Sequence, residues 1–563
     1  MTTRTLNGSI AALRPIADIA AEIGLDSSQY ATYGGFAAKI DPRIAAGNRS
    51  SHQAAYVVVT SISPTPVGEG KTTISIGLAQ GLRAIGKRAI VALRQGSLGP
   101  SFGIKGGGAG GGRSTLEPAE LLNLHLTGDM HAVTAAHNAC SAFLDNLLHQ
   151  GNTLGIEPDS ISWPRVLDMN DRALRSVTTG QGEKNGPSRQ SGFEITAASE
   201  VMSVLSLAAS YADLRERLGN IVVGFSYNAQ PVTANEIRVA GAMAALLRDA
   251  LSPNLVQTQE GTPAFVHTGP FGNVGLGNSS VIADQIALKL AEVVITESGF
   301  GSDLGFEKFC NVKCRASGLA PDAAVMVVTA RSLKAHSGQF NVRPGRPLDP
   351  GLDEEHLSAL EAGLPNLAKH LENVRWYGIP VVVAINSYPT DTEREVQMIR
   401  DFSLAAGALD AVVTTGFRDG GTGSKALARS VLAAIDEPSN FRFLYDTDQS
   451  LQAKIFEIAT RMYGACDVEY DSEAKDAIDR FEAAGSGHLP ICMAKTQYSL
   501  SDDPKLLSRP DNFSIRIRAA RLYAGAGYIV PIVGNIMLMH GLGKHPSGEN
   551  IDLLPDGTII GLS

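Results

Sequence analysis

The chain has 563 residues, of which 44% are hydrophobic and 19% are charged, and its formal net charge is -9. This length allows about two to four domains with large cores, and the composition is that of an ordinary globular enzyme. An acidic chain has no general attraction for nucleic acid or for an anionic membrane, so neither is expected as a partner. Any anionic ligand must therefore be held by local basic groups.

The five cysteines are few and scattered, which is typical of a reducing compartment. Cys310 and Cys314 are close in sequence, but no second pair lies near them, and we do not expect a metal site there. Residues 1–25 lack the apolar core of a signal peptide, and the longest apolar run, 528–539, is too short and too interrupted to span a bilayer. These features predict a cytoplasmic protein.

Residues 13–23 have an amphipathic helical pattern, and an apolar, β-rich segment follows at 56–60. A loop with two glycines and a lysine comes next, and a helical pattern covers 74–85. Strand, glycine loop and helix in this order build a phosphate cradle, in which backbone N–H groups and the helix N-terminus face the phosphates. Nucleotide binding is expected from Thr65, Pro66, Val67, Gly68, Glu69, Gly70, Lys71 and Thr72.

Within this loop, Lys71 would add a full positive charge and Thr72 would ligate Mg²⁺. Thr65 stands where the strict P-loop pattern has glycine, so the match is a variant. The alternative interpretation is a glycine-rich surface turn, but the flanking strand and helix favour the phosphate loop.

A second buried strand is predicted at 89–93, so residues 56–93 are predicted to form a βαβ unit with parallel strands. Ligands of such sheets bind beyond the carboxyl ends of the strands. Arg94 is the first residue past the second strand, and we expect it beside the phosphate loop. An arginine there suits bidentate recognition of a carboxylate or phosphate, whereas the alternative is an ordinary surface arginine.

A glycine run at 106–112 is led by Lys105. It is either a flexible linker or, as we favour, a mobile loop that closes over an anionic intermediate. His125 and His131 follow, and each could donate to phosphate, shuttle a proton or be structural. Their spacing does not put them on one helical face, so a metal pair is not expected.

Further strands are predicted at 221–224, 293–296, 324–328, 381–385 and 411–414, with helical patterns between them. The fold class is therefore α/β, with an extended, mostly parallel sheet that helices cover on both faces. Segments 344–350 and 446–451 resemble domain boundaries. We expect a large P-loop-type nucleotide-binding domain at 1–350 and two smaller α/β domains at 351–448 and 449–563.

The loop at 64–73 resembles the nucleotide loop of the formate–tetrahydrofolate ligase (10-formyltetrahydrofolate synthetase) family, and the resemblance covers nearly the whole chain. It is carried also by 93–107, 123–131, 269–271, 296–309, 313–315, 384–392 and 493–499. The resemblance implies an ATP- and Mg²⁺-dependent ligase that joins formate to tetrahydrofolate through formyl phosphate. It also implies a homo-oligomer, often a tetramer, and leaves room for a monovalent cation.

The resemblance assigns roles to individual positions. Lys71 would bind the γ-phosphate, and Arg94 would bind formate and the phosphoryl group in transit. His125 or His131 would be polar helpers. The two aromatic residues that stack on the pterin align with Tyr388 and Phe417, although an aromatic side chain at a strand end often only caps a core.

Several departures from the family lie near the chemistry. The family usually reads Arg-Glu-Pro where this chain has Arg94-Gln95-Gly96, so a carboxylate that could bind the pterin edge is a neutral amide. Leu276 replaces a histidine, Arg113 a tyrosine and Phe417 a tryptophan. Two alternatives therefore stay open: a divergent paralogue that activates a carboxylate but uses another acid or acceptor, and a P-loop switch ATPase with protein partners.

Overall fold

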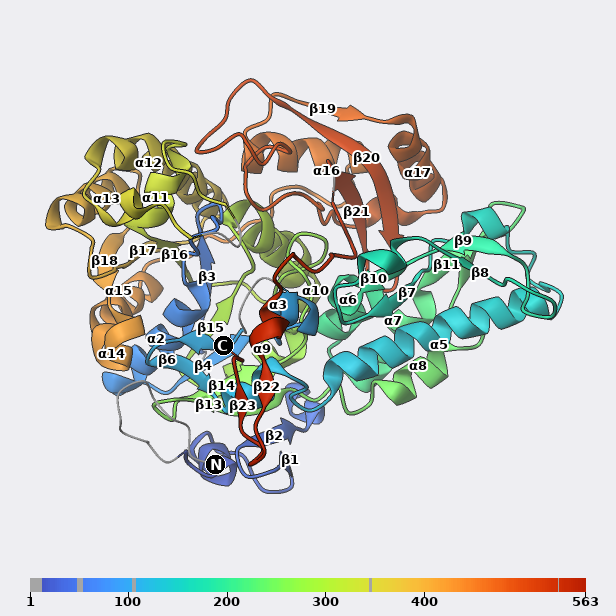
Figure 1. The fold of residues 1–563 in the computed structure, drawn as a ribbon, viewed down its shortest axis with the longest axis horizontal. Coiled ribbons are helices and arrows are strands. Elements are labelled where there is room, and N and C mark those ends of the chain that lie inside the picture. The colour runs from blue at the N-terminus through green and yellow to red at the C-terminus, as the bar shows by residue number, and fades with distance from the viewer. Residues whose placement is uncertain (1–12, 48–53, 104–107, 344–346, 535, 563) are drawn as a thin grey trace.

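The computed structural model describes residues 13–47, 54–103, 108–343, 347–534 and 536–562 (Figure 1). A large sheet of twelve strands forms its centre. Its strands are β1 (Tyr30–Tyr33), β2 (Ala37–Ile40), β3 (Ala55–Ser61), β4 (Ala89–Leu93), β5 (Gly110–Gly111), β6 (Ser114–Glu117), β13 (Asn254–Thr258), β14 (Pro263–Val266), β15 (Val293–Glu297), β16 (Ala323–Val328), β17 (Val381–Asn386) and β18 (Asp410–Thr414).

Helices surround this sheet and build the rest of the molecule. They are α1 (Ile16–Glu22), α2 (Lys71–Ala84), α3 (Leu98–Gly103), α4 (Ala119–Asn123), α5 (Asp129–His149), α6 (Glu200–Leu207), α7 (Tyr211–Asn220), α8 (Ala240–Leu246), α9 (Val281–Leu290), α10 (Arg315–Ser317), α11 (Ala330–His336), α12 (Leu357–Trp376), α13 (Glu393–Ala405), α14 (Gly416–Gly423), α15 (Lys425–Ile435), α16 (Leu451–Glu457) and α17 (Ser472–Ala483).

The main path of the sheet runs β1-β2-β13-β14-β4-β15-β3-β16-β17-β18. From β14 to β18 every pairing is parallel, whereas β1, β2 and β13 pair antiparallel. The predicted α/β class with an extended, mostly parallel sheet is confirmed. The carboxyl ends of β4, β15, β3, β16, β17 and β18 consequently lie along one edge.

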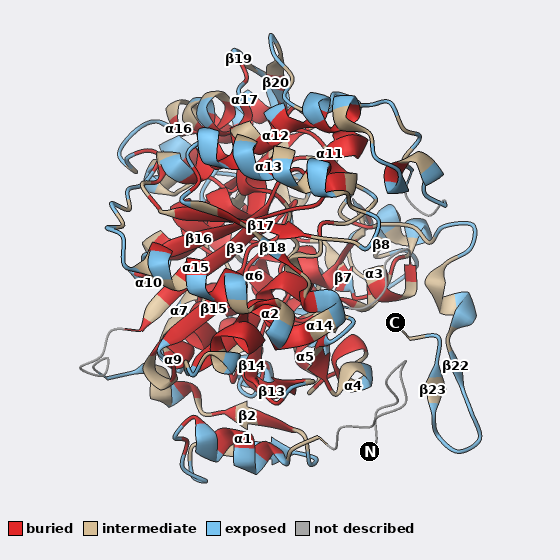
Figure 2. Ribbon diagram, turned by 90° about the vertical axis from the view of Figure 1, so that its left-hand side faces the viewer, coloured by how far each residue is buried: buried red, intermediate tan, exposed pale blue. Residues whose placement is uncertain are grey.

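Both faces of the sheet are covered because the central strands are apolar on both sides. Val57 and Val59 of β3 belong to a core with residues of α2 and α15, while Tyr56 and Val58 belong to a second core with residues of α9 and α12. Figure 2 shows these strands as buried, with the exposed residues on the outer surfaces of the helices. This alternation explains why the strands read as continuous hydrophobic runs in the sequence.

One prediction about the sheet is wrong. The strand predicted at 221–224 is β11 (Val222–Phe225), which pairs only with β12 (Pro231–Thr233), outside the main sheet. Strands β3 and β4 are parallel, as the βαβ unit predicts, and β15 lies between them. Strands β13 and β14 were not predicted, because polar residues such as Asn254 and Gln257 interrupt the apolar pattern of β13.

The described part of the glycine run contains a short strand. Gly110 and Gly111 form β5 and pair with β6, whose Leu116 also donates its N–H to the carbonyl of Ala109, at 2.7 Å. A Cβ atom on Gly112 would lie 2.0 Å from the carbonyl oxygen of Phe417, so a glycine is required there. Lys105, which leads the run, lies outside the described residues.

Two further groups of elements flank the sheet (Figure 1). One contains α5 to α8 and three small two-stranded sheets, made by β7 (Arg165–Leu167) with β10 (Phe193–Ile195), β8 (Val177–Thr179) with β9 (Arg189–Ser191), and β11 with β12. The other contains α16, α17 and a sheet of β19 (Asp467–Tyr470), β20 (Ser514–Tyr523) and β21 (Tyr528–Val533). Strands β22 (Asp552–Leu553) and β23 (Ile559–Ile560) form a final hairpin.

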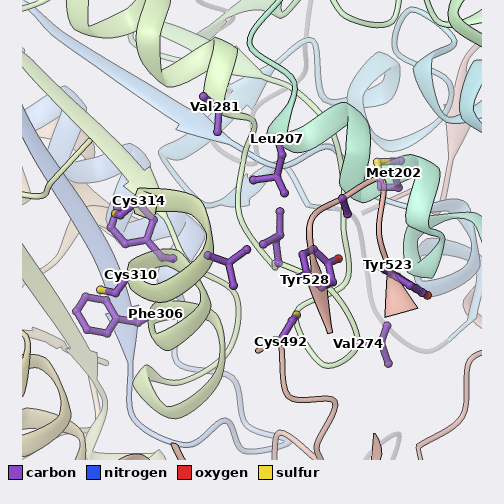
Figure 3. Packing of buried hydrophobic residues seen from close by; sticks show 14 of the residues in the cluster. Met202, Leu207, Val274, Val281, Phe306, Cys310, Cys314, Cys492, Tyr523 and Tyr528 are labelled. Carbon is purple, nitrogen blue, oxygen red and sulfur yellow. The ribbon is translucent and has the colours of Figure 1, made fainter. Parts of the chain in front are cut away.

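The C-terminal sheet docks on α6 through aromatic side chains. Tyr528 donates to the hydroxyl of Ser203 at 2.6 Å, and Tyr523 donates to the carbonyl of Ala198 at 3.2 Å. Figure 3 shows both tyrosines beside Met202 in the larger core cluster. This cluster thus joins the C-terminal region to the rest of the molecule.

Strands β17 and β18 lie within the predicted second domain, 351–448, yet they extend the sheet that β3 and β16 form. The division into 1–350, 351–448 and 449–563 stays a prediction. In the parts of the chain that the structure describes, no helix is both long and apolar enough to cross a bilayer.

Candidate active site

The loop between β3 and α2 turns sharply at two glycines. Gly68 and Gly70 have φ angles of 82° and 80°, in the left-handed region that glycine adopts without strain. A Cβ atom on Gly70 would lie 2.5 Å from Nδ2 of Asn386, the last residue of β17. This close approach allows the Asn386 amide to donate to the carbonyl of Glu69 at 3.0 Å and to hold the loop against the neighbouring strand end.

Thr65, which departs from the strict P-loop pattern, has a structural partner. Oε1 of the buried Glu69 accepts from the backbone N–H of Thr65 at 2.8 Å and from its hydroxyl at 3.1 Å. Pro66 and Val67 make the turn between them, which the N–H of Gly68 closes on the carbonyl of Thr65 at 3.1 Å. The loop is therefore closed by a side-chain bond.

The ammonium group of Lys71, the first residue of α2, lies at the base of the loop. Its Nζ donates to Oγ of Ser61 at 3.0 Å, and that hydroxyl is 3.1 Å from the carbonyl oxygen of Phe300. Ser61 is the last residue of β3. The lysine is thus positioned by the strand that precedes the phosphate loop.

Thr72 and Arg94 meet at a carboxylate that the sequence analysis did not include in the site. The hydroxyl of Thr72 donates to Oε2 of Glu297 at 2.7 Å, and Nη2 of Arg94 is 3.9 Å from Oε1 of the same residue. Glu297 ends β15, the strand between β3 and β4. Arg94 therefore lies one strand further from the phosphate loop than predicted, and Glu297 bridges the gap.

The hydroxyl of Thr72 and the carboxylate of Glu297 are oxygen ligands of the kind that Mg²⁺ prefers. In nucleotide-binding loops, Mg²⁺ is held by the loop hydroxyl, an acidic side chain at a neighbouring strand end and the substrate phosphates. Within the described residues, no group of three or more His, Cys, Asp or Glu side chains could hold a metal by itself. The residues present thus fit an ion that arrives with a nucleotide.

The guanidinium of Arg94 is largely enclosed. Its Nη1 donates to the carbonyl of Pro270 at 3.0 Å, while its buried Nε has no partner among the described residues. Burial lowers the pKa of Arg94, and the carboxylate of Glu297 opposes that shift. A partly exposed, incompletely paired cation at a strand end can bind a small anion.

Gln95 follows Arg94 and has an unpaired amide. The residue is 4% exposed, yet neither Oε1 nor Nε2 has a hydrogen-bond partner among the described residues. Its backbone N–H donates to the carbonyl of Thr268 at 2.7 Å, and Thr268 itself has a φ of 53°, which is strained for a β-branched residue. A ligand that offers both a donor and an acceptor would satisfy this amide.

The two predicted stacking residues follow adjacent strands. Tyr388 comes after β17 and is half-buried, with the guanidinium carbon of Arg331 4.0 Å from its ring centroid. Phe417 lies in the first turn of α14, which follows β18, and is 58% exposed. Its carbonyl accepts from the N–H of Arg113 at 2.8 Å, and its ring lies against Gly111.

The two histidines contact each other. Nδ1 of His125 and Nε2 of His131 are 2.8 Å apart, and both residues are exposed. His131 is in α5 and lies near Asp168, which accepts from the hydroxyl of Ser97 at 2.6 Å just before α3. Burial raises the pKa of Asp168, and its hydrogen bonds and His131 oppose the rise.

Two other positions that differ from the resembled family, Leu276 and Arg113, lie in different surroundings. Leu276 is fully buried in the larger core cluster. Arg113 is exposed beside Phe417 and lines a shallow groove with Thr415, Asp419, Thr422 and Gly423.

Cys310 and Cys314 are buried, unbonded thiols, and burial raises the pKa of each.

The sequence analysis missed the contributions of Ser61, Glu297, Asn386 and Arg331. The signal was present for each of them, because all four stand at or just after the carboxyl end of a predicted strand. Their distances from one another in sequence hid the contacts. Thr72 and Glu297, for example, are separated by 225 positions.

Comparison with known proteins shows the family of the chain. A family model described as formate–tetrahydrofolate ligase matches residues 7–563. The chain is 52% identical to the formate–tetrahydrofolate ligases of Roseiflexus sp. (strain RS-1) and Saccharopolyspora erythraea, and 49% identical to that of Cutibacterium acnes. Each of these matches covers 98% of this chain and 98% of the relative. The chain belongs to the formate–tetrahydrofolate ligase family.

Proposed function

We propose that the protein is an ATP-dependent ligase that joins formate to tetrahydrofolate, with 10-formyltetrahydrofolate, ADP and phosphate as products and formyl phosphate as the intermediate. The observation that carries the proposal is the bridge at the sheet edge, where Glu297 contacts both Thr72 of the phosphate loop and Arg94. A phosphate site and an anion site therefore adjoin, as phosphoryl transfer to a small carboxylate requires.

Charge explains the first half of the reaction. Formate and the γ-phosphate are both anions, so they approach each other only where positive charge is concentrated. We assign Lys71 to the γ-phosphate and Arg94 to formate and to the phosphoryl group in transit. The N–H groups of residues 65–72 would hold the remaining phosphate oxygens.

Thr72 and Glu297 would hold Mg²⁺ together with the phosphates of ATP. The bound ion supplies additional positive charge at the transferring phosphoryl group. Because Glu297 also faces Arg94, it would fix the arginine relative to the nucleotide. Asn386 would keep the loop in register with the strand that leads to Tyr388.

The second half of the reaction requires a site for the flat pterin ring. We assign its two walls to Tyr388 and Phe417, which follow adjacent strands, and its polar edge to Gln95, whose amide is unpaired. A pterin edge offers both hydrogen-bond donors and acceptors, which matches a carboxamide. The replacement of the family's glutamate at this position is the observation that favours a divergent acceptor as the second candidate.

The proposal also includes roles for two histidines and a lysine, a further ligand, and an oligomeric state. His125 and His131 would act as proton-transfer groups on the Asp168 side of α3, and Lys105 would add positive charge near the glycine run. A monovalent cation would be an additional ligand. We also propose a cytoplasmic homo-oligomer, with a tetramer as the expected state, which light scattering coupled to gel filtration tests directly.

The central experiment measures formyl-tetrahydrofolate formation by absorbance with ATP, Mg²⁺, formate and tetrahydrofolate. Lys71→Ala and Arg94→Ala should each lower kcat/KM by about a hundredfold or more, as loss of a transition-state cation does. Lys87→Ala and Arg88→Ala are matched controls, because these residues lie between α2 and β4 of the same βαβ segment and form ion pairs with Glu292 at the surface, and they should retain wild-type activity.

Other outcomes would change the assignment. If the wild-type protein makes no product but formate stimulates ADP formation, the activation half stands and another acceptor must be sought. If ATP turnover is independent of formate, the ligase assignment is wrong and a switch ATPase becomes the better interpretation.

A further inference from the structure

Arg331 lies over one face of the Tyr388 ring, and the reaction proposed above gives this arginine no role. The two residues follow neighbouring parallel strands, β16 and β17, in which Val328 pairs with Ile385. Arg331 and Tyr388 each stand three positions after this pair, and Arg331 lies in the first turn of α11, which Thr329 caps. Its guanidinium carbon lies 4.0 Å from the ring centroid, a cation–π contact.

The guanidinium is fixed rather than free. Nη2 forms an ion pair with Asp353, the last residue of η7 (Pro350–Asp353), and lies 3.4 Å from the hydroxyl of Thr390. The arginine side chain is only 18% exposed, and its buried Nε has no partner among the described residues. The guanidinium is therefore held over the ring by the ion pair although one of its donors is unpaired among the described residues.

Because Arg331 covers one face of the Tyr388 ring, a ligand would stack on the opposite face. A cation on one side draws π-electron density toward itself, so the other face becomes less negative. Such a face prefers an electron-rich heterocycle, and the reduced aminopyrimidinone ring of a tetrahydropterin is electron-rich. The arginine also prevents the tyrosine ring from turning away when the site is empty.

We propose that Arg331, anchored by Asp353, is the positioning residue that orients Tyr388 and makes its free face selective for the reduced pterin of the acceptor. The inference rests on the proposed stacking of the pterin on Tyr388. It concerns only the acceptor half of the reaction, because Arg331 contacts none of Lys71, Thr72 or Arg94 in the hydrogen bonds and ion pairs of the described residues.

The test separates the two halves of the reaction. Arg331→Met keeps an unbranched apolar side chain and removes the charge, and it should raise the KM for tetrahydrofolate by about tenfold. Formate-dependent ADP formation without tetrahydrofolate should stay within about twofold of the wild type, since the activation half is unaffected. Arg331→Lys retains the charge and should show a smaller rise in that KM.

Two further variants complete the experiment. Asp353→Asn weakens the anchor without touching the ring and should raise the same KM by about threefold. Arg248→Met is the matched control, because Arg248 is an exposed arginine that is ion-paired with Asp249, and it should behave like the wild type. Tyr388→Ala tests the wall itself.

Each result has one meaning. If Tyr388→Ala raises the KM for tetrahydrofolate and Arg331→Met does not, the inference is wrong and the proposed pterin wall stands. If Arg331→Met reduces the activation half as strongly as the complete reaction, its role is merely structural and the inference is also wrong. If Tyr388→Ala leaves the KM unchanged, the proposed stacking fails and the inference fails with it.

Discussion

At the scale of single residues, Gly70 is where the phosphate loop and the end of β17 come closest. Gly68 and Gly70 have nearly the same φ, 82° and 80°, but only at Gly70 would a Cβ atom meet a neighbour, Nδ2 of Asn386 at 2.5 Å. Substitutions at Gly68 and Gly70 therefore separate the cost of backbone strain from the cost of displacing Asn386.

We predict that Gly68→Ala raises the KM for ATP by less than about tenfold, because left-handed backbone costs an alanine on the order of 1 kcal/mol. Gly70→Ala should raise it several times more, since the loop must also move away from Asn386. Steady-state kinetics at saturating formate and tetrahydrofolate measure both. Equal effects of the two substitutions would show that the Asn386 contact does not shape the loop.

At the scale of elements, the hairpin of β5 and β6 supports the start of α14. A Cβ atom on Gly111 would lie 3.0 Å from the Phe417 ring, and one on Gly112 would lie 2.0 Å from the Phe417 carbonyl oxygen. The glycines thus allow a backbone approach that places Phe417 at the site. That the glycine run closes over an anionic intermediate stays a prediction.

We predict that Gly112→Ala displaces Phe417 and raises the KM for tetrahydrofolate by about tenfold, the typical cost of overpacking. Gly111→Ala should have a smaller effect, because an aromatic ring can shift by a few tenths of an ångström. The KM for ATP should change little in either variant. A rise in the KM for ATP alone would place Phe417 in the nucleotide site instead.

Helix α6 begins with a buried carboxyl group. Burial raises the pKa of Glu200 to about 8, and the N–H groups of Gly525 and Ala526, which donate to Oε1 at 2.7 and 3.3 Å, oppose the rise. In the unfolded chain the pKa returns to the ordinary glutamate value of 4.5. The folded state therefore binds more protons than the unfolded state between these values, and stability falls as the pH rises.

Glu200→Gln removes this proton while keeping an acceptor oxygen. We predict that its stability relative to the wild type increases from about pH 5 to pH 8, by roughly 1.4 kcal/mol for each pH unit over which only the unfolded chain has ionised. Urea unfolding of both proteins at a series of pH values measures the difference. A difference that does not depend on pH would show that Glu200 is ionised in the folded protein.

At the scale of the whole molecule, a buried ion pair ties the C-terminal region to the central sheet. Nζ of Lys495 is 3.2 Å from Oδ2 of Asp303, in η5 (Ser302–Phe306) just after β15, and both side chains are completely buried. Burial lowers the pKa of Lys495 and raises that of Asp303. The pairing offsets only part of the cost of removing water from both groups.

Lys495→Met should lower the free energy of unfolding by about 3–5 kcal/mol, because it leaves a buried carboxyl without its partner. The double variant with Asp303→Asn should recover part of this loss, and Lys505→Met, at an exposed lysine of the same region, should be neutral. The midpoint of the first urea transition is the measurement. A double variant no more stable than Lys495→Met would show that loss of packing, not a stranded charge, causes the effect.

Much of the architecture was predictable because its signals are local. The apolar runs of β3, β4, β15, β16, β17 and β18 are buried on both faces, so they stand out in the sequence without any knowledge of their partners. The phosphate loop was predictable for the same reason, since a strand, a glycine turn, a lysine and a helix follow one another directly. β11 has an equally good local signal, and nothing local excludes it from the main sheet.

The sequence by itself determined the buried strands β3, β4, β15, β16, β17 and β18, the position of the phosphate loop, and that Arg94 follows a strand end. Only the tertiary structure decided the order of the strands, with β15 between β3 and β4, and hence the contacts of Glu297 with Thr72 and Arg94. It likewise decided that Asn386 meets Gly70 and that Arg331 covers Tyr388. The physical reason is that hydrogen bonding between strands is the same for any pair, so strand order depends on packing between segments far apart in the chain.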